Sequence, residues 1–120
     1  MMNLMRSALA GVGLMLLASC ASLVTGGPLV RPGEPVGAID VYNGARTTVT
    51  SVLISSCSAS TYGLNRLPDG VVIRPGQSYR FTVSAGCWDI MAGHGITDGY
   101  AAARDRIQVG PNQAVRWGVR

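Results

Sequence analysis

The chain contains no lysine and only one histidine, His94, and just 13% of its residues are charged. This scarcity of charge, together with a hydrophobic content of 48%, excludes an intrinsically disordered chain, which would be richer in charged residues. A length of 120 residues leaves room for one small core and excludes a multidomain enzyme. Histidine-based catalysis needs a nucleophile and a carboxylate that converge on the imidazole, and no serine lies in a recognised nucleophile motif. We therefore expect no catalytic residues.

The N-terminus has no charge after Arg6 until well past residue 19. The apolar run at residues 7–19 is shorter than the roughly 18 to 20 residues that a helix needs to cross a bilayer. A basic start, an apolar middle and small residues at the end are the layout of a secretory signal. We therefore assign residues 1–19 to a helical signal peptide and not to a permanent transmembrane anchor.

The signal ends in Leu17-Ala18-Ser19-Cys20, which resembles the lipobox of bacterial lipoproteins. The resemblance implies cleavage before Cys20, which would then carry a diacylglyceryl thioether and, in many bacteria, an N-acyl chain. Two or three acyl chains, at roughly 0.8 kcal/mol per buried CH₂, would hold a small domain at a membrane without a spanning helix. Ala21 stands where an Asp would retain an enterobacterial lipoprotein in the inner membrane. For a cell that has an outer membrane, we expect an outer-membrane lipoprotein that faces the periplasm or the surface, with no cofactor besides this lipid.

The segment that follows is rich in proline and glycine and shows no alternation of apolar and polar residues. We interpret residues 20–37 as the lipidated cysteine and a flexible tether, which would span on the order of 20 to 25 Å. The folded domain is expected over residues 38–120.

Short β-rich runs separated by turn signals fill this domain. They lie at residues 38–42, 47–55, 71–73, 78–84, 87–92, 100–109 and 113–119. The run 47–55 has apolar side chains at both parities, which predicts a central strand or a bulged one. Alternation in the run 78–84 places Tyr79, Phe81 and Val83 on one face and predicts a half-buried strand, and the run 87–92 places Trp88, Ile90 and Ala92 on one face. Gly110-Pro111-Asn112 predicts a hairpin between the last two runs. With no helical period after the signal, the pattern predicts an all-β fold: a small immunoglobulin-like antiparallel β-sandwich of six to seven strands, with a small barrel as the alternative.

Two cysteines remain once Cys20 is assigned to lipid. Cys57 and Cys87 form an even number in an oxidising compartment, so we expect one disulfide. The alternative is a metal-binding or redox site built from Cys57, Cys87 and His94. A blue-copper centre needs two histidines and a zinc site would need the disulfide to stay open, so we expect no metal.

Several short motifs in residues 38–100 resemble a recurrent pattern in small exported bacterial β-sandwich proteins. The motifs are Asn43, Tyr62-Gly63-Leu64-Asn65-Arg66-Leu67, Pro75-Gly76, Phe81, Cys87-Trp88-Asp89 and Asp98-Gly99. The resemblance implies a β-sandwich in a secreted setting, and it implies no activity.

The net charge of +4 comes from ten arginines against six acidic residues. If the last two strands form a hairpin with Val109 facing Gln113, four arginines share one outward face. These are Arg104, Arg106, Arg116 and Arg120. Directly opposed like charges destabilise a sheet, so such a face predicts an anionic partner, the alternative being a merely solvated surface. This register turns Asp105 inward, and a shift by one residue would remove the face.

The sequence therefore predicts a membrane-anchored envelope lipoprotein whose domain is a non-catalytic interaction or structural module. The partner would be an envelope protein, and nucleic acid is not expected. A second hypothesis is binding to lipid headgroups, lipopolysaccharide or peptidoglycan through the arginine face. A third is metal binding or redox chemistry at Cys57, Cys87 and His94.

Overall fold

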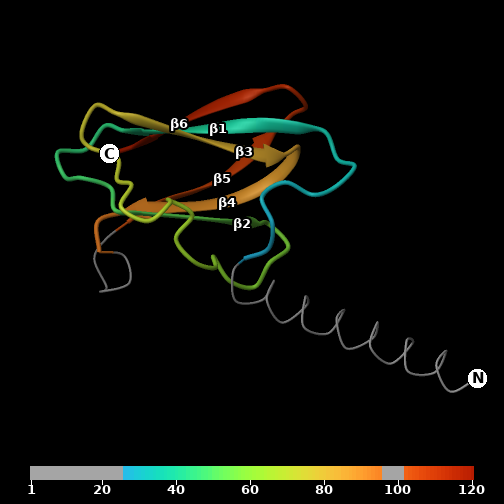
Figure 1. Ribbon diagram of the computed structural model, residues 1–120, viewed down its shortest axis with the longest axis horizontal. Helices are drawn as coiled ribbons and strands as arrows, with labels where there is room; N and C mark the ends of the chain where they lie inside the picture. The colour runs from blue at the N-terminus through green and yellow to red at the C-terminus, as the bar shows by residue number, and fades with distance from the viewer. Residues whose placement is uncertain (1–25, 96–101) are drawn as a thin grey trace, which may run out of the picture.

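The domain consists of two small β-sheets, each of three strands (Figure 1). The computed structural model describes residues 26–95 and 102–120, and within these ranges it contains strands but no helix. The strands are β1 (Val36–Asn43), β2 (Ser51–Ser56), β3 (Ser78–Ser84), β4 (Gly86–Gly93), β5 (Ala103–Val109) and β6 (Ala114–Val119). No helix in the described ranges could span a membrane. The predicted signal peptide, Cys20 and the Asp98-Gly99 motif lie outside these ranges. The all-β prediction with six strands is confirmed.

The strand order is β3-β1-β6 in one sheet and β2-β4-β5 in the other. Every neighbouring pair is antiparallel except β1 and β6, which run parallel. The prediction of a purely antiparallel sandwich is wrong for this pair. Parallel neighbours need a long connection between them, and here the rest of the domain supplies it, because β1 and β6 are its first and last strands.

The connection from β5 to β6 passes from one sheet to the other and does not form the predicted hairpin. The turn itself lies where the sequence placed it, with Asn112 in the left-handed region at a φ of 56°. The backbone N–H of Asn112 donates to the carbonyl of Val36, and that of Ala38 donates to the carbonyl of Gln113. These bonds attach the end of the turn to β1, so β6 pairs with β1 and not with β5.

The core lies between the two sheets and is built by alternate residues of each strand. Its largest fully buried side chain is Trp88, whose indole N–H donates to the carbonyl of Ser84 at 2.8 Å. The predicted faces are confirmed, because Phe81 and Val83 are buried on β3, and Trp88, Ile90 and Ala92 on β4. Burial of such apolar side chains is the main stabilising contribution to a domain of this size.

The predicted strand at 47–55 is shorter than expected and lies at an edge of its sheet. Only Ser51–Ser56 form β2, while Val49 makes an isolated bridge with Ile73. A second bridge joins Leu53 to Asn65, so the chain between β2 and β3 covers the open edge of β2. Residues 47–55 thus have apolar side chains at both parities because the chain between β2 and β3 covers the open edge of β2, and not because β2 is a central strand. The predicted strand at 71–73 is reduced to the bridge at Ile73.

The segment before β1 is attached to the domain and is not a free tether over its described part. The carbonyl of Leu29 accepts from the backbone N–H of Ser84, and that of Pro35 from Ala85. The backbone N–H of Arg31 donates to Ser84 Oγ at 2.7 Å. Residues 26–35 therefore follow the surface without forming a strand, and β1 begins at Val36 where residue 38 was predicted.

Candidate functional site

The four arginines of the predicted face are divided between two sheets. Arg104 and Arg106 lie on β5, whereas Arg116 lies on β6 and Arg120 directly follows it. Because β5 and β6 are not paired, Arg106 does not oppose Arg116 and the four side chains do not share a face. Asp105, predicted to point inward, has the register position opposite the buried Ile90 but is itself exposed at the sheet edge.

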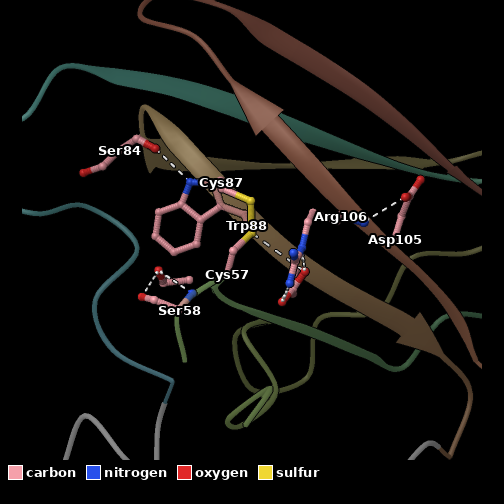
Figure 2. The surroundings of a disulfide bond; sticks show 9 residues. Cys57, Ser58, Ser84, Cys87, Trp88, Asp105 and Arg106 are labelled. Atoms are coloured by element: carbon pink, nitrogen blue, oxygen red, sulfur yellow. Dashed lines mark hydrogen bonds and ion pairs between the residues drawn. A yellow bond between two sulfur atoms is a disulfide. The ribbon is translucent and has the colours of Figure 1, made fainter. Parts of the chain in front are cut away.

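Arg106 is engaged in an ion pair with its neighbour across the strands, Asp89. Its Nε lies 2.8 Å from Oδ1 and its Nη2 lies 3.1 Å from Oδ2, a two-pronged contact (Figure 2). These hydrogen bonds lower the pKa of the Asp89 carboxyl below its ordinary value. The charge of Arg106 is therefore largely neutralised within the sheet.

A second two-pronged pair lies on the outer face of the other sheet. Arg80 on β3 contacts Asp40 on β1 at 2.7 and 2.8 Å, and the resulting hydrogen bonds lower the pKa of the Asp40 carboxyl. On the other side of β1, Arg116 on β6 is the register partner of Asp40. Its positive charge lowers the pKa of the Asp40 carboxyl further. The three strands thus carry a row of cation, anion and cation.

Arg116 makes no ion pair with the residues that the structure describes. Its guanidinium lies over the ring of Tyr42, 4.3 Å from the ring centroid. Gly44, Gly118 and Arg120 continue this surface, and together with Tyr42 and Arg116 they line an open groove of about 650 Å³. Since Gly118 has no side chain, the two arginines border a hollow in which an anionic group could be held by hydrogen bonds from both guanidinium groups.

A smaller hollow of about 440 Å³ opens at one end of the sandwich. Its lining is mainly apolar, and His94 and Arg120 supply its basic groups. His94 is exposed, and its Nδ1 lies 3.2 Å from the carbonyl oxygen of Thr48. No hydroxyl nucleophile pairs with this ring among residues 26–95 and 102–120, so the arrangement is not that of a Ser-His dyad.

The predicted disulfide between Cys57 and Cys87 is present and links the end of β2 to the start of β4 (Figure 2). The Cα atoms lie 5.5 Å apart, and the backbone N–H of Cys57 donates to the carbonyl of Cys87 at 3.3 Å. His94 follows the opposite end of β4, on the order of 20 Å from Cys87 at about 3.3 Å per residue. The structure therefore does not bring the three proposed metal ligands together. Within the described ranges it also contains no cluster of three or more His, Cys, Asp and Glu side chains that could hold a metal ion.

Arg66 is the residue with a special environment that the sequence reasoning missed. Its half-buried guanidinium donates to the carbonyl of Ile54 from Nε and Nη2, at 3.1 and 2.8 Å, and to the carbonyl of Gly27 from Nη2 at 2.7 Å. Burial lowers the pKa of Arg66, although an arginine stays protonated at any physiological pH. The only sequence signal was its position in the Tyr62-Gly63-Leu64-Asn65-Arg66-Leu67 motif.

Comparison of the chain with models of known protein families, with curated proteins and with solved structures finds no match.

Proposed function

We propose that the chain is a lipid-anchored protein of the cell envelope, held at the outer membrane through Cys20, whose domain is a non-catalytic interaction or structural module. The observation that carries the proposal is a lipobox-like Leu17-Ala18-Ser19-Cys20 placed directly before a small domain with a disulfide. Disulfides persist in oxidising compartments, so the Cys57–Cys87 bond supports an exported domain. A stable cross-link also suits a domain that works outside the cytoplasm, where it must survive without chaperones that depend on ATP.

We further propose that the sandwich is of the immunoglobulin-like type. Two small sheets, joined by connections that repeatedly pass from one sheet to the other, support this assignment. The parallel β1–β6 pair is a local departure from the antiparallel form.

Lipidation is tested by comparing the wild-type protein with Cys20→Ala in membrane fractions washed with high salt. The wild-type protein should sediment with membranes and carry the mass of a diacylglyceryl group, whereas Cys20→Ala should lack this mass and leave the membrane fraction. Ala21→Ser is the matched control, because it changes a neighbouring residue and keeps the cysteine. Ala21→Asp should keep the lipid and shift the protein to the inner membrane of an enterobacterial host. A Cys20→Ala protein that still sediments with washed membranes would refute the proposal.

The groove between Arg116 and Arg120 supports a second candidate function, the binding of an anionic envelope component. Of the four predicted arginines, these two line the same groove. The double substitution Arg116→Gln/Arg120→Gln in the Cys20→Ala chain should weaken its sedimentation with purified peptidoglycan sacculi. The effect should be clear at about 0.05 M salt and small at about 0.3 M, because salt screens exposed charges. Arg104→Gln is the control, and an equal loss in this control would contradict a role for the groove.

A further inference from the structure

The attached N-terminal segment fixes the point at which the chain leaves the domain. Gly26 is buried, and the carbonyl of the next residue, Gly27, accepts the hydrogen bond from Arg66. A Cβ on Gly26 would lie 3.0 Å from Nη2 of Arg66 and 3.2 Å from the carbonyl oxygen of Tyr62. The chain therefore enters the domain through a close fit beside the loop that carries Tyr62 and Arg66.

Several further contacts hold the segment in this place. The guanidinium of Arg31 lies over the buried Trp88, 5.0 Å from the ring centroid, and forms an ion pair with Glu34. The backbone bonds of Leu29 and Arg31 with Ser84 tie the same segment to the end of β3. The contacts with Ser84 and Trp88 join residues far apart in the sequence, so the segment is part of the fold and not a loose extension of the anchor.

This attachment limits how far the domain can move from the membrane. Six Cα–Cα steps separate Cys20 from Gly26, and a fully extended chain of that length spans about 20 Å. A free tether from Cys20 to residue 37 would span up to about 60 Å. With Cys20 at the bilayer, the surface next to Gly26 is thus held near the lipid headgroups, and the domain cannot turn freely.

Two exposed apolar side chains and a half-buried tyrosine belong to the two chain segments that meet at this exit point. Leu64 is the most exposed large hydrophobic residue of the described chain, at 55%, and it follows Gly63, whose Cα lies 3.4 Å from the Cβ position of Gly26. Val30, four residues after Gly26, is 47% exposed. Tyr62, with an apolar ring and a polar hydroxyl, is of the type found at membrane interfaces. We call Val30, Tyr62 and Leu64 the exit surface.

We propose that the exit surface rests on the bilayer that holds the acyl chains of Cys20. The proposal depends on the lipid anchor proposed above. A contact between so few side chains and lipid would be too weak to recruit a free protein. The lipid anchor keeps the exit surface next to the bilayer, so its effective concentration there is high and weak contacts suffice to orient the domain. The bound orientation turns the edge of β2 toward the membrane.

The orientation is measured with added tryptophans in the full lipidated protein, reconstituted in vesicles of phosphatidylethanolamine and phosphatidylglycerol. Leu64→Trp reports on the exit surface. Ala114→Trp is the matched control, because Ala114 is exposed on β6, at the far edge of the other sheet. The native Trp88 and Trp117 are buried, and their signal is subtracted with the parent protein.

In vesicles with acyl chains brominated near the headgroups, the added fluorescence at position 64 should be quenched at least twofold more than that at position 114. Arg66→Ala, introduced into Leu64→Trp, should reduce this difference because it releases Gly27. Equal quenching at the two positions, or stronger quenching at position 114, would overturn the proposal. An absence of quenching at both positions, as expected if a protein and not lipid covers the exit surface, would overturn it as well. Tyr62→Trp is a second reporter if Leu64→Trp does not fold.

The same sample separates this inference from the anchor itself. Mass spectrometry of the reconstituted protein reports the lipid on Cys20. A chain without lipid would overturn both the anchor and the orientation. A lipidated chain without preferential quenching would overturn the orientation alone.

Discussion

Removing the disulfide with the double substitution Cys57→Ala/Cys87→Ala should destabilise the domain strongly without changing its fold. The bond closes a loop with a sequence separation of 30 and joins the end of β2 to the start of β4. Both cysteines are only partly buried, so their replacement by alanine removes little core packing. Trp88, directly after Cys87, stays in place through its hydrogen bond to Ser84. The effect should therefore come mainly from the unfolded chain, which gains freedom when the loop opens.

For a loop of this length the chain-entropy relation gives about 3.7 kcal/mol at 25 °C. The free energy of unfolding expected for a domain of this size is roughly 5 to 12 kcal/mol, so the bond supplies a large share. With a urea dependence of about 1 to 2 kcal/mol/M, the midpoint of unfolding should fall by about 2 to 4 M.

The assay is urea unfolding of the full chain, purified in a non-ionic detergent and followed by tryptophan fluorescence. Trp88 and Trp117 are both buried and report the loss of the core. Reduced wild-type protein should unfold close to the double variant. Ser58→Ala, an exposed change next to Cys57, should stay within about 0.5 kcal/mol of the wild type. A loss below about 1 kcal/mol in the double variant would show that the cross-link does not stabilise the domain by restricting the unfolded chain.

Three further predictions concern the core and the ion pairs, each measured by the same unfolding assay. Gly37→Ala should lower the free energy of unfolding by about 2 to 4 kcal/mol, because a Cβ there would lie 2.6 Å from the carbonyl oxygen of Gln113. Gly118→Ala is the control and should be nearly neutral, because there is open space around Gly118. Similar losses of stability in both variants would show that the close contact at Gly37 is not the cause. Asn43→Ala should cost about 2 to 4 kcal/mol, since this fully buried side chain donates to two carbonyls and accepts a backbone N–H, and a value below about 1 kcal/mol would show that these bonds are dispensable. Asp40→Asn should be destabilising at pH 7, where the wild-type carboxylate pairs with Arg80. The difference in unfolding free energy between wild type and variant should shrink as the pH falls below about 4, because the pKa of Asp40 is lowered in the folded protein and its protonation removes the stabilising ion pair. A difference that does not depend on pH would rule out the ion pair as its cause.

The sequence predicted which side chains face the core more reliably than which strands are neighbours. The alternation in residues 78–84 located β3 with its correct bounds, because one buried face imposes a period of two on a half-buried strand. The order of the strands depends on long-range pairing, and the alternation of apolar and polar residues along one strand carries no information on that pairing. Gly110-Pro111-Asn112 illustrates this, since the same turn residues fit a hairpin within one sheet and a connection between two sheets.

Among the candidate sites, too, the prediction that did not depend on strand order was correct and the one that depended on it was wrong. The disulfide could be predicted from the number of cysteines and the expected export of the chain, without knowledge of the strand order. The shared arginine face could not, because it depended on Arg106 lying opposite Arg116 in a hairpin that does not form. The attachment of residues 26–35 was missed for another reason. A composition rich in proline and glycine indicates the absence of regular structure, but it carries no information on carbonyl groups that a distant arginine binds.

The parallel pairing of β1 with β6 has a consequence for the order of folding during the proposed export. A chain that crosses a membrane from its N-terminus delivers β1 first, yet β1 is the middle strand of its sheet and receives β6 last. Until residues 114–119 have emerged, one edge of β1 has no neighbour and stays open to association with other chains. The two ends of the domain must therefore meet before the sheet is complete, which makes folding slow in comparison with a fold built from local hairpins. Loss of the last few residues by truncation would leave a chain that is unable to close its core.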